Sequence, residues 1–153
     1  MISLQFVTAG TLADKAIQAY EHGWASHVDL VMPDGALLGA QATACGGQPA
    51  GVYVRPVGYS TWQKVQRVNL EASDVQLARF LAFARAQIGK SYDFEAIAAF
   101  PLGRDWRAPD SWFCSELGAA ALEASGWLPK QIDESVNKIA PRDLLMIVSP
   151  WAV

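Results

Sequence analysis

The chain has 153 residues, of which 52% are hydrophobic and 18% are charged, and its net charge at pH 7 is -3. This length suits one domain with its own core, so we expect residues 1–153 to form a single domain. The composition excludes a disordered or fibrous chain. The twelve Lys and Arg residues form no basic stripe, so nucleic acid is not an expected partner.

The amino terminus, MISLQFVTAG, has neither the basic start nor the long apolar run of a signal peptide. No stretch approaches the roughly 20 apolar residues that cross a bilayer. Two cysteines, Cys45 and Cys114, are too few and too far apart for a disulfide framework. We therefore expect a protein that is cytoplasmic at synthesis and has no integral membrane span.

The first half of the sequence predicts mostly sheet. ISLQFVT alternates as a half-buried strand does, and a helix follows, with Thr11 as its N-cap and Gly23 as its end. SHVDLVM and ALLGAQ, joined by the turn PDG, predict a hairpin whose first strand begins near His27. Residues 42–50 read as a loop, and GVYVRPV and WQKVQRVNL predict two more strands.

The second half predicts helices. One is capped by Ser73, runs to Gly89, and has an apolar face that we expect to be core: Leu77, Phe80, Leu81, Ala84 and Ile88. SYDFEAIAAF predicts a short helix, and PLGRDWRAPD a loop. DSWFCSELGAAALEASG predicts a helix capped by Asp110 or Ser111 and ended by Gly126. The apolar run after Pro141 predicts a last strand, which makes the whole an α+β protein.

Cys114 falls in the first turn of its predicted helix, where unpaired backbone N–H groups stabilise a thiolate. The thiolate is the nucleophilic form of cysteine, and a histidine beside it would complete the minimal apparatus for acyl transfer. The alternative is a small buried hydrophobe, as most free cysteines are. His27, at the start of a strand, is the candidate base, with a surface histidine as its alternative.

A catalytic histidine needs a polar group on its other ring nitrogen. Asp29 shares a strand face with His27, and Gln41 is expected to lie near it across the hairpin, so either residue is a candidate. His22 is expected in the last turn of the first helix, where it would complement the helix dipole. Glu116 is expected to play the corresponding acidic role in the first turn of the cysteine helix.

The sequence contains no motif that indicates another kind of catalytic or binding site. The sequence has no phosphate-binding glycine loop, no GxSxG elbow and no Cys/His cluster at metal-ligand spacing, so no cofactor or metal is predicted. The six tryptophans follow no period and are expected to serve as core and cleft wall.

Four segments in this order, SHVDLVMPDG, IGKSYDFEAI, WFCSELGAAALEASG and APRDLL, together resemble the permuted NlpC-like papain superfamily. This branch includes YiiX-like bacterial proteins and lecithin retinol acyltransferase, and in it the histidine precedes the cysteine, as here. The resemblance covers residues 24 to 145. It implies a circularly permuted papain-like fold, with a small antiparallel sheet or barrel packed against helices.

The resemblance also implies residue roles. Cys114 would be the nucleophile, His27 the general base, and Tyr92, in GKSYDF, a donor to an oxyanion. Many permuted relatives have an acidic residue or a second histidine on the strand after the histidine strand, whereas ALLGAQ offers only Gln41. The implied function is a thiol hydrolase that cleaves an amide bond, with cell-wall peptide as the first substrate to test. The alternatives are an acyltransferase that uses the same pair on a peptide, amide or lipid ester, and a binding module that keeps the fold.

Overall fold

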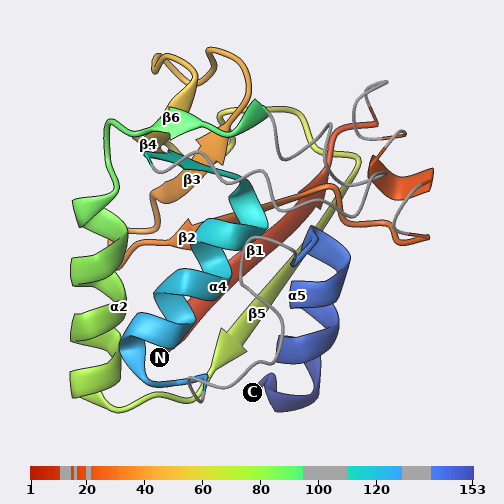
Figure 1. Cartoon of the computed structure of the whole chain (residues 1–153). Helices are drawn as coiled ribbons and strands as arrows, with labels where there is room; N and C mark the ends of the chain where they lie inside the picture. The colour runs from red at the N-terminus through yellow and green to blue at the C-terminus, as the bar shows by residue number, and fades with distance from the viewer. Residues whose placement is uncertain (11–14, 16, 20–21, 95–109, 129–138) are drawn as a thin grey trace.

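A five-stranded antiparallel sheet backs three helices in the computed structural model of this chain (Figure 1). The structure describes residues 1–10, 15, 17–19, 22–94, 110–128 and 139–153. In the view of Figure 1, helix α4 runs in front of the sheet with α2 on one side and α5 on the other. The α+β class predicted from the sequence is confirmed.

The sheet has the strand order β4-β3-β2-β1-β5 and contains the five longest strands of the described chain. Their bounds are β1 Ile2–Thr8, β2 His27–Val31, β3 Leu37–Gln41, β4 Gly51–Arg55 and β5 Lys64–Leu70. Alternate residues of the strands face the core, among them Leu4, Val28 and Leu30, which are at most 1% exposed, and α4 packs against β2 and β3. His27 and Asp29 alternate with Val28 and Leu30 along β2, and His27 is the first residue of the strand, so it lies at one end of the sheet.

The predicted hairpin is confirmed as β2 and β3. Gly35, with a φ of 87°, allows the reversal, and the Ala36 N–H donates to Asp34 at 3.0 Å. Leu30 pairs with Leu38 and Val31 with Leu37. Carried further along the hairpin, this register sets Asp29 opposite Gly39 and His27 opposite Gln41.

Helix α2, Asp74–Ala86, begins at the predicted Ser73 cap, where Ser73 and Gln76 form a reciprocal capping box. Its core face is confirmed at Phe80 and Ala84. The predicted core position Ile88 is instead 43% exposed, because the helix ends before it.

Helix α4, Cys114–Ser125, places Cys114 at its first position. Its N-cap is Phe113, not Asp110 or Ser111, because Ser111–Trp112 forms a short strand, β7, parallel to β6, Ser91–Tyr92. Gly126 ends α4 in the left-handed conformation, with a φ of 76°, as predicted.

One further prediction is wrong in the described residues, and another is wrong at its start. The segment after Ala140 forms helix α5, Pro141–Val148, and a short 3-10 helix, η3, Ser149–Trp151, rather than a last strand. Pro141 at the first helical position is preset for a helix start, which the apolar run obscured. The predicted helix SYDFEAIAAF starts later than expected, because Ser91–Tyr92 forms strand β6; Phe94 is helical, and the rest of the segment lies outside the described residues.

The first predicted helix is described only in part. Residues 17–19 are helical, whereas the predicted cap Thr11 lies outside the described residues, as does the predicted loop up to 109. In the part of the chain that the structure describes, no helix combines the length and apolarity needed to span a membrane.

Candidate functional site: a histidine, a carboxylate and a thiol

Two residues that the sequence left as alternatives lie beside one ring nitrogen of His27. Its Nε2 lies 2.9 Å from Oδ1 of Asp29, on the same strand face. The Gln41 amide lies 2.8 Å from the same nitrogen, across the hairpin. His27 is 8% exposed, so it is not the surface histidine of the alternative interpretation, and Asp29 beside it is completely buried. The structure therefore brings together His27, Asp29 and Gln41.

Gly39 makes room for this arrangement. A Cβ at position 39 would lie 2.0 Å from Asp29 Oδ1 and 3.5 Å from His27 Nε2. Real Cβ atoms do not approach so closely, so any side chain here would displace the carboxylate from the ring. The glycine in LLGAQ thus clears the space that a buried histidine–carboxylate pair needs.

Tyr59, which sequence reasoning did not single out, completes the polar cluster. Its hydroxyl donates to Asp29 Oδ2 at 2.9 Å and accepts from the Gln41 amide. Burial, followed by the Asp29 charge, raises the pKa of Tyr59 above its ordinary value, so the phenol stays protonated and remains a donor. Both oxygens of Asp29 therefore have a partner.

Trp62 covers the histidine ring. The two rings are stacked, with centroids 6.2 Å apart and an angle of 14° between planes, and Tyr59 meets Trp62 edge-on at 5.3 Å. This is the cleft-wall role expected of some tryptophans, whereas Trp151 is 66% exposed and belongs to no core. The loop that supplies both rings, GYSTW, gave only a weak signal, namely two aromatics beside a turn glycine.

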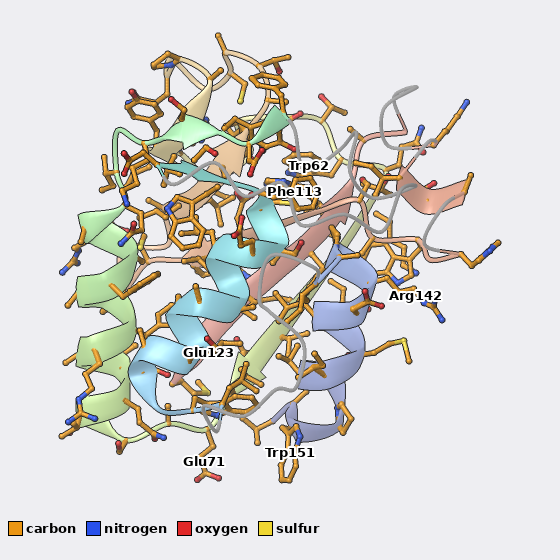
Figure 2. All side chains as sticks on the ribbon, in the orientation of Figure 1. Trp62, Glu71, Phe113, Glu123, Arg142 and Trp151 are labelled. Carbon is orange, nitrogen blue, oxygen red and sulfur yellow. The ribbon has the colours of Figure 1, made fainter. Side chains whose placement is uncertain are left out.

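Cys114 lies at the N-terminal end of α4, at the end of the helix where Figure 2 labels Phe113. The thiol is 2% exposed. The first amides of a helix have no acceptor within the helix and create a partial positive charge, which favours a thiolate. Glu116 accepts the Phe113 N–H at 3.2 Å, the first-turn role predicted for it. The structure thus places Cys114 at the end of the helix where the unpaired backbone N–H groups gather, as predicted.

The histidine cluster and Cys114 interact. Burial alone would lower the pKa of His27, but attraction to Asp29 and Cys114, with a hydrogen bond to each, raises it to about 10. Since the protonated Nε2 donates to Asp29, the other ring nitrogen, Nδ1, is left for the thiol. With this pKa the His27 imidazole is protonated at neutral pH, with the Asp29 side chain at Nε2.

Tyr92 lies in β6, with its ring 6.0 Å from that of Phe113, the cap of α4. Burial raises the pKa of Tyr92 above its ordinary value, and the Cys114 charge adds to the effect. The Tyr92 hydroxyl is therefore a neutral donor within electrostatic reach of the cysteine.

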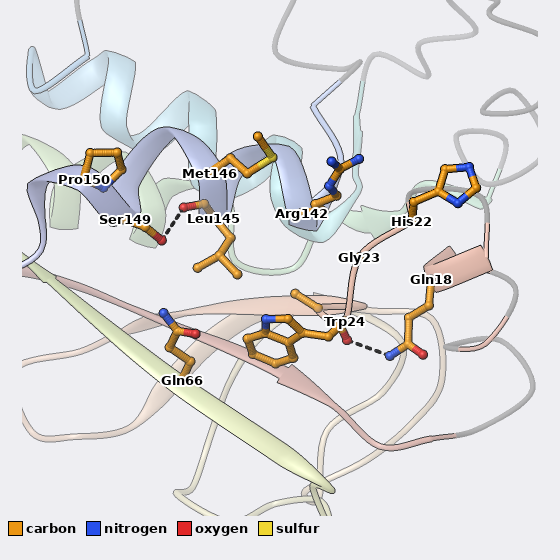
Figure 3. A pocket seen from close by; sticks show the side chains of 11 residues that line it. Gln18, His22, Gly23, Trp24, Gln66, Arg142, Leu145, Met146, Ser149 and Pro150 are labelled. Carbon is orange, nitrogen blue, oxygen red and sulfur yellow. Dashed lines mark hydrogen bonds between the residues drawn. The ribbon is translucent and has the colours of Figure 1, made fainter.

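His22 is separate from this cluster. It occupies a turn with a left-handed φ of 52°, not the last turn of a helix as predicted. It lines a groove of about 780 Å³ against α5, together with Trp24, Gln66 and Arg142 (Figure 3). The lining of this groove contains none of the predicted site residues.

Comparison with known proteins supports the fold. No protein-family model matches the chain, and no curated protein matches its sequence. Among solved structures, the metalloprotein YiiX from Escherichia coli O157:H7 is similar, with a TM-score of 0.61 and 22% sequence identity. The match covers 83% of this chain and 66% of the YiiX chain. At this identity the likeness establishes a YiiX-like α+β fold.

The described residues do not fit a metal centre. No group of three or more His, Cys, Asp or Glu among them is arranged to hold an ion. His27, Asp29 and Cys114 do interact, but both Asp29 oxygens already accept hydrogen bonds, Oδ1 from His27 and Oδ2 from Tyr59. We therefore derive no step of the chemistry through a metal.

Proposed function

We propose that this protein is a thiol hydrolase of the permuted NlpC-like papain type, acting as one domain, with Cys114 as nucleophile and His27 as general acid and base. The observation that supports it best is the buried contact between His27 and Asp29, which leaves the second ring nitrogen of His27 to Cys114.

The proposed reaction cleaves an amide. The Cys114 thiolate attacks the carbonyl carbon, His27 gives its proton to the leaving amine, and a thioester forms. His27 then takes a proton from water, whose oxygen attacks the thioester and releases the acid. Asp29 stabilises the imidazolium by charge, which Gln41 alone could not do. The Tyr92 hydroxyl and the first amides of α4 donate to the oxyanion.

Cell-wall peptide is the first substrate to test, by the family resemblance. The same thioester would serve an acyltransferase, and product analysis with water or an added amine as acceptor distinguishes the two. The non-catalytic alternative is less well supported, because the carboxylate that ALLGAQ lacks is supplied by Asp29.

The direct test is alkylation by iodoacetamide at neutral pH, followed by peptide mass analysis. The chain has two cysteines and two histidines, so each proposed catalytic residue has a control of the same type: Cys45 for Cys114, and His22 for His27. We expect Cys114 to react faster than the more exposed Cys45, His27→Ala to slow Cys114 at least tenfold, and His22→Ala to leave it unchanged. Equal, slow reaction at both cysteines in folded protein contradicts the proposal.

A further inference from the structure

Arg55 is the largest fully buried side chain in the described residues, and it is 1% exposed. Its guanidinium lies on the same sheet face as Asp29, at the end of β4. Each of its five N–H groups donates to a backbone carbonyl, at 2.9 to 3.4 Å: those of Gly39, Cys45, Pro49, Gly51 and Tyr53. Among the described residues, no carboxylate forms an ion pair with it.

The charge of Arg55 is offset by five carbonyl dipoles and not by a carboxylate, and an apolar side chain of similar volume would leave those five carbonyls unpaired. The planar guanidinium holds five carbonyls in a fixed fork, and neither an apolar residue nor lysine can reproduce that geometry. Its acceptors come from β3, the loop 42–50 and β4, so one group ties three segments together.

Two of the groups that contact Arg55 also contact Asp29. The Gly39 carbonyl accepts from Nη1 at 3.0 Å, and Gly39 is the residue packed against the Asp29 carboxylate. The Tyr59 ring lies 5.8 Å from the guanidinium carbon, and its hydroxyl donates to Asp29. Arg55 thus touches both neighbours that fix the carboxylate and does not touch the carboxylate itself.

We propose that Arg55 is a positioning residue, which holds Gly39 and Tyr59 where they keep the Asp29 carboxylate against His27. A contribution of Arg55 to catalysis rests on the proposed function, whereas its effect on the position of Asp29 relative to His27 does not. When the fork is lost, Tyr59 and the loop 42–50 shift, Asp29 is held less closely to the ring, and the imidazolium loses part of its stabilisation.

The test is an NMR titration of the His27 ring in the full chain. The chain has only two histidines, so a His22→Gln background leaves one signal. The titratable groups that act on His27 are Asp29, Cys114 and, through Asp29, Tyr59. Arg55→Lys keeps the positive charge and removes the fork. We expect it to lower the His27 pKa by about one unit or more and to slow Cys114 alkylation about tenfold.

A pair of glycine variants tests the same inference without touching Arg55. Gly46 and Gly47 both have a left-handed φ, of 59° and 77°. A Cβ at Gly46 would lie 2.8 Å from the Tyr59 Cβ and 3.3 Å from the Arg55 Cβ, whereas a Cβ at Gly47 has nothing within 4 Å. Gly46→Ala should therefore lower the His27 pKa, and Gly47→Ala, with the same backbone strain, should not.

The outcomes separate this inference from the proposed function. An unchanged His27 pKa in both Arg55→Lys and Gly46→Ala overturns the positioning role, even when Cys114 reacts fast in the unmodified chain. If circular dichroism shows Arg55→Lys to be unfolded, the comparison of Gly46→Ala with Gly47→Ala decides. A lowered His27 pKa in these variants supports the positioning role even if iodoacetamide alkylates Cys114 no faster than Cys45 in the unmodified chain. Such equal alkylation would contradict only the proposed hydrolase.

Discussion

Asp29 and His27 lie on one face of β2, two residues apart, with the carboxylate completely buried and 2.9 Å from the ring nitrogen. The sequence left Asp29 and Gln41 as alternative partners of His27, and the family resemblance directed attention to the strand that follows the histidine strand, where only Gln41 is polar. The structure places the acid on the histidine strand itself, and the following strand contributes a glycine that makes room for it. The third member of the proposed triad is thus Asp29, with Gln41 beside it.

Replacement of Asp29 by asparagine should slow alkylation of Cys114. The variant removes the charge that stabilises the imidazolium and keeps the shape. A hydrogen bond to a charged group contributes about 1.5–3 kcal/mol, which corresponds to a rate decrease of roughly tenfold to a hundredfold. Asp74→Asn, at the exposed start of α2, is the control and should react as the unmodified chain does. Unaltered labelling of Cys114 in Asp29→Asn would rule out a charge role.

Gly39→Ala should both destabilise the protein and disturb the pair, because its new Cβ would collide with Asp29. We expect a loss of about 1–3 kcal/mol in the free energy of unfolding together with slower alkylation of Cys114. Gly118→Ala is the control: its Cβ would meet Leu144 at 2.9 Å in the core, with neither Asp29 nor His27 among its neighbours. It should cost stability but leave the alkylation rate of the folded protein intact. If both variants change the rate alike, the effect is general and the space-making role of Gly39 is wrong.

Local patterns predicted the elements that position the site. Apolar and polar residues alternating on both sides of a Pro-Asp-Gly turn predicted the β2–β3 hairpin. Because the turn sets the register of a hairpin, the same pattern predicted that Gln41 lies near His27. The first-turn position of Cys114 followed from the alanine-rich helix that Gly126 ends. Contacts across a hairpin or within a helix turn are set by nearby residues, so the sequence shows them.

Contacts from distant segments were not visible. Tyr59 reaches Asp29 from a loop 30 residues away in the chain, and no local pattern pairs them. The α5 prediction failed for another reason: an apolar run such as LLMIV suits a strand or a buried helix equally, and the proline before it was the deciding signal. Arg55 looked like a strand residue because periodicity cannot tell a buried cation from an exposed one.

Tyr59→Phe isolates one hydrogen bond of the cluster. The ring stays against Trp62 and Arg55, but Asp29 loses its second donor. We expect the free energy of unfolding to fall by about 1–2 kcal/mol, as measured by urea denaturation, and Cys114 alkylation to slow several-fold. Tyr53→Phe is the matched control, since its ring also lies beside Arg55, at 5.9 Å. An equal loss in both variants would mean that the Tyr59 hydroxyl does not hold Asp29.

Tyr92→Phe separates oxyanion binding from thiolate formation. Attack on an ester creates an oxyanion, whereas alkylation by iodoacetamide does not. We therefore expect the burst of nitrophenol from 4-nitrophenyl acetate to slow about tenfold, with the alkylation rate of Cys114 unchanged. The alkylation rate is the internal control for an intact thiolate. A variant that slows both reactions equally would assign Tyr92 to packing around Phe113 rather than to the oxyanion.

The protonation of His27 should make stability depend on pH. Its pKa is about 10 in the folded protein and near 6.5 when unfolded, so the folded state holds the proton more tightly. The resulting stabilisation is fully present below about pH 6.5 and is lost as the pH rises through about 10. Urea denaturation at pH 6, 8 and 10 should therefore show the advantage of the unmodified chain over His27→Gln shrinking with pH. His22→Gln, at an exposed turn, should show no such trend. A constant difference across this range would mean that His27 is neutral in the folded state, and with it the imidazolium–thiolate pair would be excluded.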